Sequence, residues 1–98
     1  MKRFVLTKLA EDDLHQINNY LDERAGPTTA RRVMTEIRLA MDFLGGQPDV
    51  GHVREDLTNR PLKFWSVFSY LIVYDPTPCP IQVIRVLHGA QDVEHLLQ

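Results

Sequence analysis

The chain has 98 residues, of which 44% are hydrophobic and 24% are charged. This length suits one domain over residues 1–98, and this composition excludes an intrinsically disordered chain. The formal net charge of −2 argues against a protein that binds nucleic acid by neutralising many phosphates, and the single cysteine, Cys79, excludes an internal disulfide. Because nothing resembles a signal peptide and no apolar run approaches the ~20 residues that span a bilayer, we expect a cytoplasmic protein without membrane contact.

The N-terminal segment predicts a strand followed by a helix. Residues 3–7 are rich in β-forming residues, and Thr7 is a suitable cap for a helix with an apolar stripe at Ala10, Leu14, Ile17 and Leu21. An acidic run, Glu11 to Asp13, lies in its first turn, where the helix dipole favours anions. Because consecutive helical residues point about 100° apart, we interpret this run as a solvated helix start and not as a metal site.

A second helix is predicted from Pro27 to about Leu44. Gly26 suits the end of the first helix, Pro27 suits the first turn of the second, and two glycines follow Leu44. The short link makes the two helices an antiparallel hairpin. Its arginines lie off the apolar stripe, and we interpret them as a solvated face: Arg31, Arg32 and Arg38.

Residues 47–61 form the longest irregular segment, with two prolines and no clean period. Long loops in small domains often carry function, so its candidate polar groups are noted: His52, Arg54 and Arg60. No cysteine or histidine stands at a metal-ligand spacing from His52, so no metal site is predicted.

The C-terminal third predicts three strands. Residues 63–67 and 70–75 form a hairpin that turns near Phe68 and Ser69, and the proline-rich segment 75–80 is a second turn that holds Cys79. Residues 81–88 are almost continuously apolar, which is typical of an interior strand buried on both faces. Gly89 ends this strand, and residues 92–97 can add one helical turn.

This order, β-α-α-β-β-β, predicts an α+β fold in which the helical hairpin packs on one face of a mainly antiparallel sheet. The other face is then expected to be an open, shallow concave surface. Because Phe64 and Trp65 are adjacent in a strand, one ring must point away from the helices. We expect that ring to be an aromatic anchor for a partner, and we name Trp65 as the candidate.

The chain resembles the RelE/ParE superfamily of bacterial type II toxins, and specifically its ParE-like branch. The similar segments are AEDDLHQINNY (10–20), Pro27 with Ala30, Pro48, Gly51 and Leu57, and YLIVY (70–74). The most distinctive is IRVLHGAQD (84–92), which is similar to the closing RVLHGARD signature of the family. The family usually has arginine where this chain has Gln91.

The resemblance implies a plasmid- or chromosome-borne toxin that a co-expressed antitoxin neutralises. ParE-like members inhibit DNA gyrase, whereas RelE-like members cleave messenger RNA on the ribosome. The first hypothesis is therefore a gyrase inhibitor that is not an enzyme, needs no cofactor and does not itself bind specific DNA sequences. The alternatives are a metal-independent ribonuclease and an inactive member that binds only its antitoxin, which the Gln91 departure leaves open.

A ribonuclease needs a base, an acid and cations around the scissile phosphate. The available residues are few: Lys63, Arg85, His88 and Arg60. In a regular strand Arg85 and His88 point to opposite faces, so a bulge or the strand end must bring them together. In the alternative, purely structural roles, His88 bonds to the backbone at the strand end and Arg85 forms a salt bridge to Asp75 or Asp92.

The candidate partner contacts are Trp65, Arg85, His88 and Asp92. We expect the antitoxin to dock on the exposed groove of the helical hairpin and on the open sheet face.

Overall fold

The structure is a computed structural model that describes residues 3–97. The elements follow in the order β1 (Phe4–Leu6), α1 (Lys8–Ala25), α2 (Pro27–Gly46), a 3₁₀ turn η1 (Pro48–Val50), β2 (Lys63–Val67), β3 (Tyr70–Asp75), β4 (Ile81–His88) and α3 (Val93–Leu96). The predicted order of helices and strands is confirmed. None of the helices in this part of the chain combines the length and apolar character that a bilayer crossing requires.

The four strands form one mixed sheet in the order β1-β4-β3-β2. β1 runs parallel to β4, and the other neighbours are antiparallel, so the mainly antiparallel sheet is confirmed. β1 is short and pairs only with Ile81 to Val83. The second half of β4 is therefore a sheet edge, although the apolar sequence predicted an interior strand throughout.

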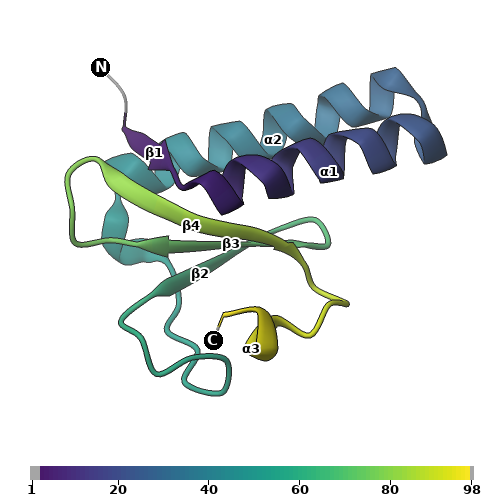
Figure 1. Ribbon diagram of the computed structural model, residues 1–98. Coiled ribbons are helices and arrows are strands. Elements are labelled where there is room, and N and C mark those ends of the chain that lie inside the picture. The colour runs from purple at the N-terminus through teal and green to yellow at the C-terminus, as the bar shows by residue number, and fades with distance from the viewer. Residues whose placement is uncertain (1–2, 98) are drawn as a thin grey trace.

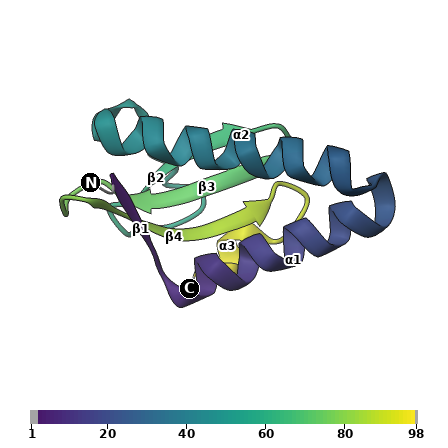
Figure 2. The same ribbon diagram turned by 90° about the horizontal axis from the view of Figure 1, so that it is seen from above.

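The helical hairpin covers one face of the sheet (Figures 1 and 2). The Thr7 hydroxyl accepts a hydrogen bond from the Ala10 N–H (3.1 Å) and so caps α1, and it donates to the Ile84 carbonyl (2.7 Å). Gly26 links the helices at a φ of 90°, a conformation that glycine adopts without steric cost. Beneath the helices, the main core contains buried side chains from both helices and from the sheet: Ala10, Ile17, Ile37, Met41, Leu44, Tyr70, Ile72, Tyr74, Ile81, Val83 and Val86.

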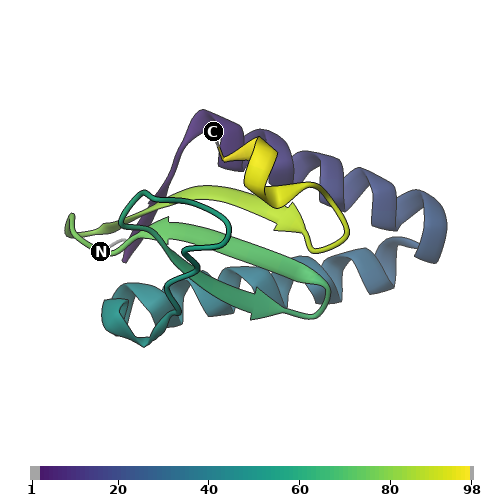
Figure 3. The ribbon, with the colours of Figure 1, turned by 90° about the horizontal axis from the view of Figure 1, so that it is seen from below.

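The second face of the sheet is also covered, so the prediction of an open concave surface was wrong. Figure 3 shows the loop of residues 47–62 and the C-terminal segment with α3 lying across it. Phe64 is the ring that points away from the helices, and only 2% of it is exposed. A second apolar cluster joins the strands to these two segments: Leu62, Phe64, Val73, Leu87, Val93 and Leu97. The covering segments have apolar anchors without a regular period, and periodicity arguments do not detect such anchors.

The start of the long loop is fixed to the sheet through Tyr74. Its hydroxyl donates to the Pro48 carbonyl (2.7 Å) and accepts from the Gly51 N–H (3.0 Å). Burial raises the pKa of Tyr74, although the bond from Gly51 acts in the opposite direction. His52 then forms two backbone hydrogen bonds with Phe64, of 2.9 and 2.7 Å. The loop is thus an ordered part of the sheet edge.

Candidate functional site

The open edge of β4 is closed by side chains in place of a neighbouring strand. The carboxylate of Asp13, on α1, accepts a hydrogen bond from the Val86 N–H (3.0 Å). Two residues further along β4, the side-chain oxygen of Gln91 accepts a hydrogen bond from the His88 N–H (2.7 Å). These bonds satisfy backbone donors that would otherwise be unpaired at the edge of the sheet.

Arg85 forms an ion pair with the same aspartate. Its Nε and Nη2 donate to the two carboxylate oxygens of Asp13 at 2.7 and 2.8 Å, and this carboxylate raises the pKa of Arg85. The alternative in which Arg85 forms a salt bridge is therefore confirmed, but the partner is Asp13 and not Asp75 or Asp92. The description of Asp13 as solvated was wrong, since only 8% of it is exposed. It lies one turn before Ile17 on the sheet-facing side of α1, and that position directs it to the strand edge.

A bulge interrupts β4, but it does not bring Arg85 and His88 into one site. The pairing with β3 shifts between Val73 and Tyr74, which leaves Ile84 as the extra residue. From Arg85 to His88 the pairing is regular again, so the two side chains leave β4 on different faces. The Arg85 guanidinium is held at the strand edge by Asp13 of α1, whereas the His88 ring packs edge-on against Tyr70 of the main core, with ring centres 5.4 Å apart.

His88 is half-buried and bonded to backbone. Its Nδ1 accepts a hydrogen bond from the Ala90 N–H (3.0 Å), so Nε2 bears the hydrogen of the neutral ring. The amide of Gln91 closes the same turn. An arginine here could not accept the His88 N–H, because a guanidinium has no acceptor. The Gln91 departure thus has a structural explanation.

The other two candidate contacts lie on different parts of the molecule. Trp65 packs on the helix side of β2, so the expectation that it is an aromatic anchor on the opposite face was wrong. Its ring centre lies 5.7 Å from that of Phe43, and the ring of His52 is stacked on it at 6.0 Å and 7°. Asp92 is exposed and caps α3, since its carboxylate accepts from the His95 N–H (3.3 Å). Their roles as partner contacts stay predictions.

The candidate ribonuclease residues do not converge. Lys63 pairs with Tyr74 and His88 pairs with Tyr70, so they stand four residues apart along β3, about 13 Å. The guanidinium of Arg85 is already bound in the ion pair with Asp13. Arg60 belongs to the loop on the second face of the sheet, beside Glu94. Within residues 3–97 no group of three or more His, Cys, Asp or Glu side chains could hold a metal ion.

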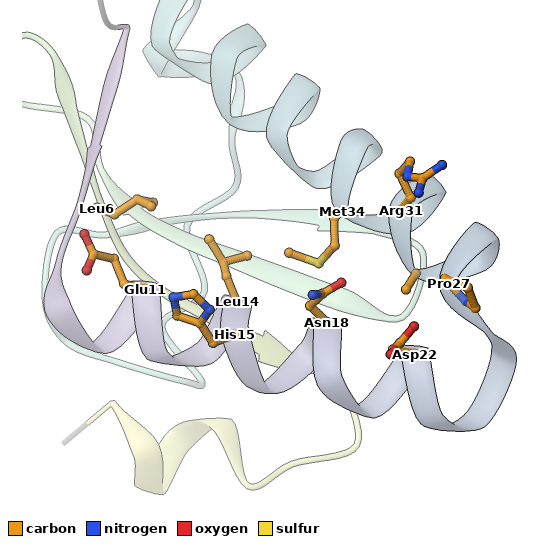
Figure 4. Close-up of a pocket in the computed structure, with 10 residues that line it drawn as sticks. Leu6, Glu11, Leu14, His15, Asn18, Asp22, Pro27, Arg31 and Met34 are labelled. Carbon is orange, nitrogen blue, oxygen red and sulfur yellow. The ribbon is translucent and has the colours of Figure 1, made fainter.

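A groove of about 610 Å³ runs between α1 and α2 (Figure 4). We call it the helical groove. Its apolar floor is contributed by β1 and both helices: Leu6, Leu14, Ala30 and Met34. Its polar rim is acidic along α1, with Glu11 and Asp22, and has Arg31 on α2. The helical hairpin therefore has the groove on which the antitoxin was expected to dock, and the acidic rim of this groove was not predicted.

Comparison with known proteins gives one family and one fold. The family model described as the ParE toxin of type II toxin-antitoxin system, parDE, matches residues 4–93. No curated protein matches the chain. Among solved structures, a chain of the chromosomal ParDE TA system from P. aeruginosa has a TM-score of 0.72 at 18% identity. The alignment covers 87% of this chain and 92% of that chain. At this identity, the structural match supports the fold.

Proposed function

The chain belongs to the ParE toxin family of type II toxin-antitoxin systems, and from this membership we propose that it stops growth in the cytoplasm by binding DNA gyrase. In this proposal the toxin is a protein inhibitor and not an enzyme. A co-expressed antitoxin neutralises it by direct binding.

The observation that carries the proposal is the dispersal of the groups that RNA cleavage would need. Metal-independent cleavage requires an acid, a base and cations within reach of one phosphate. Here Lys63 on β2 and His88 on β4 pair with positions of β3 that are about 13 Å apart along that strand. The guanidinium of Arg85 is bound by Asp13. This arrangement favours action by binding over action by catalysis.

The function is tested by inducing the toxin in cells without antitoxin. We expect growth to stop and plasmid DNA to lose negative supercoiling while messenger RNA stays intact. Normal supercoiling together with RNA cleavage would favour the RelE-like alternative, and His88→Ala would then show whether the histidine takes part. Undisturbed growth would indicate an inactive member.

For the antitoxin, we propose docking in the helical groove. The apolar floor suits the apolar face of a partner segment, and the carboxylates of Glu11 and Asp22 suit basic residues at its border. The covered second face of the sheet is less suitable, because α3 and the loop would have to leave it.

This docking site is tested with Met34→Asp, which places a charge in the floor of the groove. We expect antitoxin affinity to fall by about tenfold or more, since a charge would be desolvated without a partner. Leu39→Asp is the matched control, because Leu39 is 52% exposed on the same helix and does not line the groove. Equal affinity of the Met34→Asp variant and the wild type would rule out the groove.

A further inference from the structure

Polar residues stand beside the apolar stripe of α1 where the helix passes the end of the sheet. Leu21 still packs on the main core, but Tyr20 and Arg24, three and seven residues after the buried Ile17, are both exposed. Arg24 lies about 16 Å along the helix from Asp13, whereas β4 extends only two residues past Val86. Figures 1 and 2 show the closed end of the hairpin projecting past the strands. These two side chains therefore lie where the sheet has ended.

The ends of β3 and β4 contribute two further rings at this place. Tyr70 and His88 are cross-strand partners, with ring planes at 85°. The pKa of Tyr70 is raised by burial and, to a smaller degree, by the nearby phenol of Tyr20. The Arg24 guanidinium lies 5.1 Å from the ring centre of Tyr20. We call these four residues the strand-end cluster.

The chemistry of the strand-end cluster suits an anion. Because Nδ1 of His88 accepts from backbone, Nε2–H is its free donor. Arg24 takes part in none of the ion pairs found within residues 3–97. The exposed phenol of Tyr20 adds a hydroxyl donor, the buried ring of Tyr70 supports the His88 ring, and the cluster itself has no carboxylate. A shallow hollow lined by Tyr70, His88 and Gly89 adjoins it.

The strand-end cluster has one permanent cation, Arg24, and this indicates which kind of anion it can bind. A nucleic-acid backbone is bound through several phosphates and needs several cations, whereas one guanidinium matches one carboxylate. We propose that the strand-end cluster binds an acidic side chain of the protein that this toxin inhibits, with Arg24 as the charged contact. This inference rests on the proposed function, because it names the chemistry by which the toxin holds its target.

The test compares Arg24→Glu with wild-type toxin in a gyrase supercoiling assay. We expect the toxin concentration for half-inhibition to rise by about tenfold or more, because two carboxylates would then face each other. Arg38→Glu is the matched control, since it makes the same charge change at an exposed arginine on α2. His88→Gln should weaken inhibition less. Thermal unfolding and antitoxin binding, measured on each variant, verify that the fold is intact.

Three results would contradict the proposal. Undiminished inhibition by the folded Arg24→Glu variant would remove the role of the cluster. An equal loss in Arg38→Glu would indicate a general charge effect. Binding of an oligonucleotide alone by the wild type, abolished by Arg24→Glu, would assign the cluster to phosphate instead. If the wild type leaves gyrase active, the proposed function itself fails and this target is lost with it.

Discussion

Asp13 is the residue that connects the two layers of the molecule. It accepts two hydrogen bonds from the Arg85 guanidinium and one from the Val86 N–H. Its side chain is 9% exposed and that of Arg85 is 15% exposed, so water competes weakly for this pair. The same contact that fixes α1 on β4 engages two of the nitrogen atoms of the Arg85 guanidinium.

Replacing this aspartate is expected to destabilise the fold strongly. Asp13→Ala leaves a nearly buried guanidinium without a counter-ion and the Val86 N–H without an acceptor, which should cost about 3 kcal/mol of unfolding free energy. Urea denaturation followed by circular dichroism measures it. Asp12→Ala is the control, because Asp12 pairs with Lys8 at the exposed surface and should matter little. Equal stability of the two variants would show that the pair has no structural role.

At the scale of elements, segments without regular pattern complete the sheet. The start of the 47–62 loop depends on Tyr74, which bonds Pro48 and Gly51, and a Cβ at Gly51 would collide with the Tyr74 ring. α3 is a single turn that contributes Val93 to the second cluster. Both segments keep the second face of the sheet away from solvent.

Tyr74→Phe should loosen the loop. The change leaves a buried N–H and a carbonyl without partners, at a cost of about 1–3 kcal/mol. Amide exchange at Gly51 should accelerate more than exchange in β3. Unchanged protection at Gly51 would show that the hydroxyl does not hold the loop.

The same hydroxyl predicts an alkaline limit of stability. Burial raises the pKa of Tyr74 above its ordinary value of 10.0, so the folded state prefers the neutral phenol. Its contribution is complete below the ordinary pKa and is lost as pH rises through the raised one. The wild type should therefore lose more stability above pH 10 than Tyr74→Phe does, and parallel curves would contradict this.

At the scale of the whole molecule, the sequence alone predicts the order of the helices and strands, the helical hairpin and the family. The apolar stripe from Ala10 to Ile17 has helical spacing, and the IRVLHGAQD segment is a contiguous signature, so both can be recognised in the sequence alone. The partner of Arg85 could not be found in this way, because Asp13 is 72 residues distant and only the folded chain brings the two together. The covered second face was missed for a related reason, since Leu62, Val93 and Leu97 have no common period.

The strand-end cluster was partly visible in the sequence. The sequence alone indicates His88 as a candidate, but Tyr20 and Arg24 have the pattern of ordinary helix residues. Tyr70 is a buried core residue, and only the fold shows its contact with His88. The hydrogen bond from Val86 to Asp13 fixes the position of α1 along β4. The lengths of the two elements then show that the helix extends beyond the strand. We therefore propose two partner surfaces on this fold, the helical groove for the antitoxin and the strand-end cluster for the target.

For the molecule as a whole, we propose that this toxin inhibits gyrase by binding. Its most direct test is supercoiling of relaxed plasmid by purified gyrase, with increasing toxin and with antitoxin added afterwards. We expect that supercoiling declines as toxin is added, that RNA in the same reaction stays intact and that antitoxin restores activity. Full supercoiling at excess toxin, with cleavage of messenger RNA on added ribosomes, would contradict it.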